Sequence, residues 1–141
     1  MNAVDTNVVV YSLDQHEPAK RAKAGDLFNR LGQTGDRPVL LWQVAGELLS
    51  CLRKWEDRGR IARTDTPFYL QRIRAMFPLI MPSPLILEKA LELSARYSLS
   101  HWDSMLLVLA ACHDAGVDTL YSEDLDPGMT YETVTVVNPF V

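Results

Sequence analysis

The sequence predicts an α/β fold in which a mostly parallel β-sheet is covered by helices. Short runs of β-branched residues alternate with longer segments whose apolar residues recur every three or four positions, the pattern of strands separated by helices. Of the 141 residues, 48% are hydrophobic and 23% are charged, as in ordered globular proteins. We therefore expect one domain over residues 1–141 with a single core.

Two strands and one helix are expected in the first third of the chain. Residues 3–13 are rich in β-branched side chains and predict a buried strand, although three polar residues lie near its start. Residues 18–31 predict a helix that begins with proline and is followed by glycine. Residues 38–42 predict a brief apolar strand.

The middle of the chain is expected to be mainly helical. Residues 43–55 carry an apolar stripe of helical period, and residues 65–77 begin with Asp-Thr-Pro, an N-cap candidate before a proline. Residues 81–84 predict a turn or strand edge, and residues 86–98 an amphipathic helix. The apolar residues of the helix expected over residues 65–77 could face a core or an interface, and the core is favoured. These residues are Phe68, Tyr69, Ile73, Met76 and Phe77.

The last third predicts the most apolar helix and two further strands. The helix covers residues 100–115 and ends before Gly116, because glycine is common directly after a helix. Residues 119–122 and 133–137 are rich in β-branched residues and predict strands.

The charge distribution favours a nucleic-acid enzyme more than the net charge does. A net charge of −4 argues against a polyanion partner, yet half of the 14 basic residues lie between positions 53 and 74. This combination fits carboxylates that hold metal and basic side chains that hold RNA, but the charges alone slightly favour the alternative, a solvated helical face. The candidate RNA-binding residues are Arg53, Lys54, Arg58 and Arg60.

One acidic residue interrupts a predicted strand and another follows one, and open parallel sheets bind ligands beyond the carboxyl ends of their strands. Asp5 directly follows Val4 inside a buried run, and a metal ion is one of the few partners that would supply the missing charge. The alternative is an Asp that caps a helix. Asp124 follows residues 119–122 and is the preferred ligand there, while Glu123 is expected to face solvent and Asp126 to form an ordinary turn.

Two further acids lie on predicted helices. Glu47 falls at the edge of an apolar stripe, so that a core boundary and the surface are both open to it. Asp103 opens the most apolar helix, where capping is the alternative to metal ligation. Oxygen ligands of this kind suit Mg²⁺ or Mn²⁺. One ion would activate water for attack on phosphorus, and a second, if present, would stabilise the leaving oxygen.

Taken in order, these motifs resemble the PIN domain family, and closely its bacterial VapC toxins. The motifs are Val4-Asp5-Thr6-Asn7-Val8, Glu47 after a short strand, Trp102-Asp103-Ser104, and Tyr121-Ser122-Glu123-Asp124-Leu125. The similarity spans essentially the whole chain, with Ser122 where threonine is usual.

The resemblance implies a metal-dependent endoribonuclease that is the toxin of a type II toxin–antitoxin system. It assigns metal ligation and catalysis to Asp5, Glu47, Asp103 and Asp124, with Thr6 as an assisting hydroxyl. It further implies Mg²⁺ or Mn²⁺ as cofactor, RNA as substrate, a cognate antitoxin as partner and a homodimer.

Other functions are less well supported by the residues. A phosphatase of the haloacid dehalogenase type would carry a second Asp where this chain has Asn7, and a serine hydrolase or P-loop enzyme would need glycine motifs that are absent. A PIN-like RNA-processing nuclease without an antitoxin, or a catalytically silent PIN-fold binding module, remains open. Because the sequence has neither a signal-peptide pattern nor an apolar run of about 20 residues, we expect a cytoplasmic protein without membrane contact.

Overall fold

The computed structural model confirms the α/β architecture. It describes residues 1–35, 37–97, 103–126 and 128–141, without the side chains of residues 103, 104 and 106. The elements follow in the order β1 (Asn2–Val4), α1 (Thr6–Leu13), α2 (Pro18–Gln33), β2 (Leu40–Leu41), α3 (Trp42–Asp57), α4 (Asp65–Met76), β3 (Leu79–Ile80), α5 (Leu85–Tyr97), α6 (Asp103–Ala115), β4 (Thr119–Tyr121), β5 (Thr130–Tyr131) and β6 (Val134–Val137).

The strands form a mostly parallel sheet, as predicted. In the four-stranded sheet the order is β1-β4-β6-β5, with β1, β4 and β6 parallel and β5 antiparallel to β6. Parallel strands β2 and β3 form a second, two-stranded sheet. A bridge between Ala3 and Val39, with the Val39 N–H donating to the Asn2 carbonyl at 2.8 Å, joins it to β1. The strand ends of both sheets therefore lie near one another.

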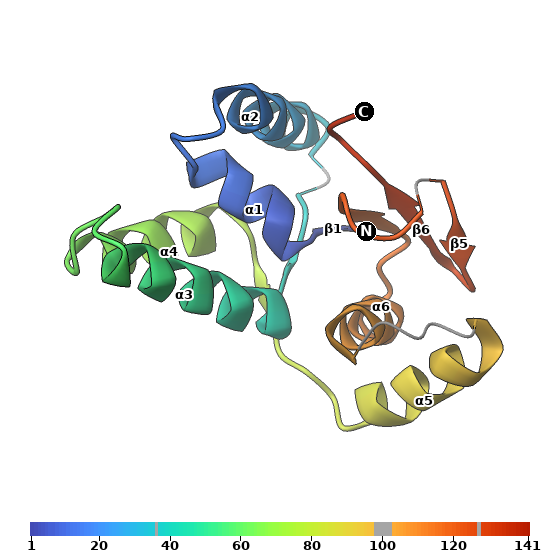
Figure 1. Ribbon diagram of the computed structural model, residues 1–141. Helices are drawn as coiled ribbons and strands as arrows, with labels where there is room; N and C mark the ends of the chain where they lie inside the picture. The colour runs from blue at the N-terminus through green and yellow to red at the C-terminus, as the bar shows by residue number, and fades with distance from the viewer. Residues whose placement is uncertain (36, 98–102, 127) are drawn as a thin grey trace.

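The helices cover the sheet in two groups. Figure 1 shows α1 to α4 gathered on one side, with α5 and α6 together on the other. The core between these layers contains fully buried side chains from each, including Leu48 of α3, Leu109 of α6 and Leu120 of β4. Such close-packed apolar burial from layers on both faces is what a parallel sheet requires. In the described part of the chain, no helix has the length and apolar character to cross a bilayer.

The predicted strand over residues 3–13 is wrong beyond Val4. The Asp5 side chain accepts a hydrogen bond from the Thr6 N–H at 2.8 Å, and α1 begins there. Val8 and Val9 are fully buried on this helix. A short apolar run cannot distinguish a buried strand from a buried helix, so the cap and not the β-branched composition decides the structure.

Smaller differences concern element ends and one missed strand. Of the two alternatives for residues 81–84, the strand edge is wrong: this segment runs into a turn at Pro84, and β3 ends directly before it at Ile80. The strand β5 was not predicted, since a strand of two residues leaves almost no pattern. Trp42 begins α3 and does not end a strand. Of the apolar residues that were expected in the core from the helix over residues 65–77, Ile73 and Phe77 are buried, whereas Phe68 is exposed.

Candidate metal-binding and catalytic site

The parallel register of β1 and β4 brings the centre of the candidate site together. Val4 is paired with Tyr121, and the Asp5 N–H donates to the Tyr121 carbonyl at 2.9 Å. The next residue of each strand therefore lies beside the other, and the Ser122 Oγ donates to the Asp5 Oδ2 at 2.7 Å. Both side chains are buried. The sheet thus places a carboxylate and a hydroxyl at the carboxyl ends of adjacent strands, where α/β sheets bind ligands.

The buried Asp5 carboxyl resists ionisation. Burial raises its pKa to about 6, from an ordinary value of 3.8, against the hydrogen bonds from Ser122 and Thr6, which lower it. The carboxylates of Asp124 and Glu47 raise it further. Like charges that approach a buried acid disfavour its charged form. The site therefore concentrates more negative charge than its own hydrogen bonds stabilise.

Glu47 is fixed in orientation from two sides. The Thr6 hydroxyl donates to its Oε2 at 2.6 Å, and Gln43, one turn earlier on α3, donates to its Oε1 at 3.0 Å. Glu47 is half-buried. The position at the core boundary, one of the two open for this residue, is therefore the correct one, and Thr6 meets a second predicted ligand.

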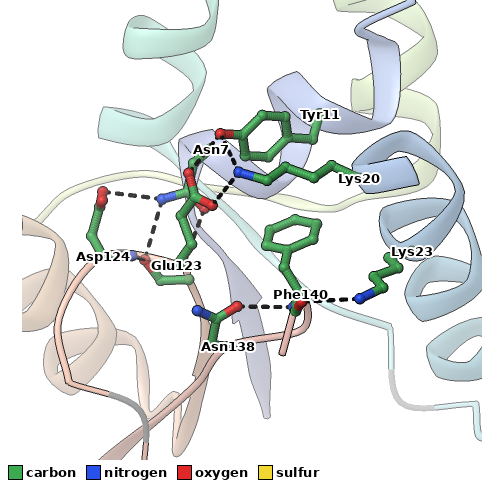
Figure 2. Close-up of polar contacts among 9 residues, drawn as sticks. Asn7, Tyr11, Lys20, Lys23, Glu123, Asp124, Asn138 and Phe140 are labelled. Carbon is green, nitrogen blue, oxygen red and sulfur yellow. Dashed lines mark hydrogen bonds and ion pairs between the residues drawn. The ribbon is translucent and has the colours of Figure 1, made fainter. Parts of the chain in front are cut away.

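Asp124 is exposed and is oriented by Asn7. The Asn7 amide donates to Asp124 Oδ2 at 3.0 Å, and lies 3.4 Å from the Ser122 Oγ (Figure 2). The Asp124 N–H in turn donates to the Ser122 Oγ at 3.1 Å. Asp5, Asn7 and residues 122–124 are thus joined by one hydrogen-bond network, with Asp124 on its solvent side.

Asp103, the fourth predicted ligand, begins α6, but its side chain lies outside the described residues, as do His101 and Trp102. Among the described side chains, no three Asp, Glu, His or Cys residues are grouped closely enough to hold a metal ion. Asp5, Glu47 and Asp124 are linked through their hydrogen bonds with Ser122, Thr6 and Asn7, but these three carboxylates do not by themselves form a metal site. Metal ligation by all four acids stays a prediction.

Glu123 was expected to face solvent, and that expectation is wrong. Its carboxylate accepts hydrogen bonds from the Tyr11 hydroxyl at 2.7 Å and from Lys20 at 3.0 Å. Its hydrogen bond raises the pKa of Tyr11. Tyr11 lies one helical turn after Asn7, so a helix over this segment would have predicted that the two side chains share a face. The prediction of a strand over residues 3–13 did not allow this inference. Gln43 was likewise missed.

The candidate RNA-binding residues differ in their surroundings. Lys54 and Arg58 are exposed at the end of α3. The Arg53 side chain is exposed and pairs with Glu56 at 3.4 Å. Arg60 is more enclosed, because it pairs with Asp14 at 2.6 Å and its guanidinium lies 4.4 Å from the Trp55 ring centroid. Lys54 and Arg58 are therefore the members most open to a ligand.

Comparison with known proteins adds a family and a fold. A model of the PIN domain family matches residues 3–126. A chain in the crystal structure of VapBC2 from Rickettsia felis bound to a DNA fragment from their promoter is similar, with a TM-score of 0.71 and 15% identity over 96% of both chains. At this identity the likeness shows a shared fold. No curated protein sequence matches the chain significantly.

The raised pKa of Asp5 predicts a specific pH dependence of stability. Without metal, the folded carboxyl keeps its proton up to about pH 6, whereas the unfolded one loses it near 3.8. The folded state then binds more protons between these values, so stability falls as pH rises through them. The free energy of unfolding of the wild type, minus that of Asp5→Asn, should fall by about 1–3 kcal/mol across the window.

Urea denaturation in EDTA at several pH values measures this difference. The subtraction removes the contribution of all other titrating groups that the substitution leaves unchanged. A difference that is constant with pH would show that the folded Asp5 carboxyl titrates as it does in the unfolded chain.

Proposed function

The chain belongs to the PIN domain family, and from that premise we propose that it is a metal-dependent endoribonuclease, the toxin of a toxin–antitoxin pair. Members of the family are generally nucleases that use divalent metals. The observation that carries the proposal is the buried Asp5 carboxyl, whose pKa is raised to about 6 beside two further acids. A buried acid whose pKa is strongly perturbed by desolvation and by neighbouring charges is typical of functional sites.

The donor chemistry of the site fits Mg²⁺ or Mn²⁺. The proposed ligands are Asp5, Glu47, Asp103 and Asp124, all with the hard oxygen atoms that these ions prefer. A bound divalent cation would also favour the ionised form of Asp5 that burial now opposes. Such an ion lowers the pKa of a bound water and polarises a phosphoryl oxygen.

The neighbouring polar residues keep the proposed ligands in place. Ser122 orients Asp5, Thr6 orients Glu47, and Asn7 orients Asp124, each through a hydrogen bond to a carboxylate oxygen. Such charge-assisted contacts would orient Asp5, Glu47 and Asp124 without a bound ion, which lowers the cost of organising these three ligands. Thr6 is therefore a positioning residue in this proposal.

RNA is the proposed substrate, and α3 offers a basic path toward the site. Lys54 follows Glu47 by seven residues, a spacing that places both on one face of α3, and Arg58 is the residue that caps the carboxyl end of this helix. At 1.5 Å per residue Lys54 lies about 10 Å from Glu47 along the axis, and Arg58 lies beyond the end of the helix. Exposed cations in these positions suit backbone phosphates on one side of the cleaved bond. Arg53 and Arg60 are proposed as weaker contributors because each is already paired with an acid.

The cleavage proposal is tested with Asp5→Asn and a matched Asp26→Asn control. Asp26 is exposed on α2, so its substitution removes the same charge away from the site. Wild type and Asp26→Asn should cleave RNA with Mg²⁺ or Mn²⁺ and stop in EDTA, and Asp5→Asn should lose at least about 100-fold in rate. Gel analysis of end-labelled RNA measures this. Equal cleavage by the three proteins, or cleavage that persists in EDTA, would refute the proposal.

The basic path is tested by the salt dependence of RNA binding. With Asp5→Asn as a background that does not cleave, Lys54→Glu and Arg58→Glu should each reduce the slope of log affinity against log salt concentration by about one. Arg21→Glu, which reverses an exposed charge on α2, is the control and should leave the slope close to that of the parent. Fluorescence anisotropy at several salt concentrations measures the slopes. A similar change in all three variants would leave the α3 path without support.

A protein partner, the cognate antitoxin, is proposed from the family and from two apolar hollows. The hollows, of about 410 and 550 Å³, share Trp42 in their walls, and the side chain of Trp42 is 52% exposed. Exposed aromatic and apolar side chains around such hollows suit a protein interface. A homodimer is also proposed, with Leu87 and Leu91 exposed on α5; a monomeric mass by sedimentation would contradict it.

The antitoxin is tested by co-expression with the product of a neighbouring small open reading frame. The two proteins should copurify, RNA cleavage should be inhibited, and Leu49→Glu, in the larger hollow, should weaken the complex at least about tenfold. Met129→Glu is the control, because Met129 is as exposed as Leu49 but lines neither hollow and is not on α5. Failure to copurify, or equal weakening by both variants, would contradict the proposed docking surface.

A further inference from the structure

Glu123, the residue before Asp124, is bound by side chains of two helices, α1 and α2. Its Oε1 accepts from the Tyr11 hydroxyl of α1 at 2.7 Å, and its Oε2 accepts from Lys20 of α2 at 3.0 Å. Lys20 also lies 3.0 Å from the Tyr11 hydroxyl, so the three groups form a closed triangle (Figure 2). This arrangement differs from a surface ion pair, because each partner is in contact with both of the others.

The Tyr11 member of this triangle also packs against an aromatic ring. The Tyr11 ring meets the edge of the Phe140 ring, with centroids 5.1 Å apart, and the Lys20 ammonium lies 4.4 Å from the Tyr11 centroid. Lys23 of α2 donates to the Phe140 carbonyl at 3.0 Å, which ties that residue to the same helix. Tyr11 is therefore fixed by its ring as well as by its hydroxyl.

The backbone of Glu123 is bound as well as its side chain. Its N–H donates to the Asn7 Oδ1 at 3.3 Å, while the Asn7 amide donates to Asp124 Oδ2. Asn7 and Tyr11 are four residues apart and share one face of α1. That face thus contacts two consecutive residues: Tyr11 binds the Glu123 side chain and Asn7 binds the carboxylate of Asp124.

We propose that Tyr11, Lys20 and Glu123 form a positioning cluster that fixes the segment 122–124 and thereby presents the Asp124 carboxylate to the metal site. The inference rests on the proposed function for the role of Asp124. The described hydrogen bonds that involve side chains join these three residues to one another and to Asn7, and none reaches Asp5, so they are positioning residues and not catalytic ones. Glu123, although acidic and next to a proposed ligand, is turned toward α1 and α2.

Tyr11→Phe is the sharpest test because it changes no charge and keeps the ring that packs on Phe140. Lys20→Met is a less specific variant, because it would also remove a cation near the acidic site. That loss of positive charge by itself favours binding of a metal ion. Tyr97→Phe is the matched control: the Tyr97 hydroxyl accepts a hydrogen bond from the Glu132 N–H at 2.7 Å, and its ring meets Tyr131 edge-on at 5.2 Å. Tyr11→Phe and Tyr97→Phe each delete one hydroxyl from an aromatic pair.

Two measurements are made on the full chain, amide hydrogen exchange without metal and Mn²⁺ affinity by calorimetry. In Tyr11→Phe, exchange at Glu123 and Asp124 should become roughly tenfold faster, the effect of losing one hydrogen bond to a charged group. Mn²⁺ affinity should weaken by about three- to tenfold. Tyr97→Phe should change neither quantity.

The outcomes separate this inference from the proposed function. Unchanged exchange in Tyr11→Phe would overturn the cluster as a clamp. Faster exchange with unchanged Mn²⁺ affinity would overturn its role in positioning Asp124, while the nuclease proposal would stand. If the wild type bound Mn²⁺ no better than Asp5→Asn, the proposed metal site would fail, and the positioning role would fail with it.

Discussion

The Asp5 carboxylate is the point on which the arrangement of the site depends. It stands where β1 ends and α1 begins, accepts a hydrogen bond from the first residue of that helix, and accepts another from Ser122 at the end of β4. The chain therefore leaves the sheet at the residue that also links adjacent strands. Thr6 and Asn7 then point from the first turn of α1 to Glu47 and Asp124. One capping residue thus determines the direction in which two neighbouring polar side chains reach.

The ionised Asp5 carboxylate, which the proposed metal site would use, is the form that burial in the fold disfavours. Burial of Asp5 near two other acids raises its pKa to about 6, so that ionising the folded site costs free energy. Active sites commonly retain such unfavourable groups where the bound state needs them, and the surrounding core supplies the stability. Positive and negative charges are also separated along the chain. Lys54 and Arg58 are exposed near the carboxyl end of α3, whereas Asp5 and Asp124 follow the ends of β1 and β4.

The sequence predicted the helix-covered parallel sheet, because the alternation of strands and helices depends on local pattern, and it singled out Asp5 as an acid that interrupts an apolar run, although the end of the strand at Val4 was not predicted. The stripe of residues 43–55 has a helical period, and it lies within α3. The valines of α1 were misread because a short apolar run has no distinguishing period. The contacts of Glu123 could not be read at all, since Tyr11 and Lys20 are 112 and 103 residues away in the chain. Tertiary packing alone brings them together.

The central claim is that a divalent cation binds at the Asp5 carboxylate. Anomalous diffraction from crystals soaked in Mn²⁺ tests it most directly, because the signal identifies the ion and its position independently of activity. The account predicts an anomalous peak in contact with an Asp5 oxygen and facing Asp124, and no such peak in crystals of Asp5→Asn. Ordered wild-type crystals with no peak at Asp5, or the same peak in both proteins, would contradict it.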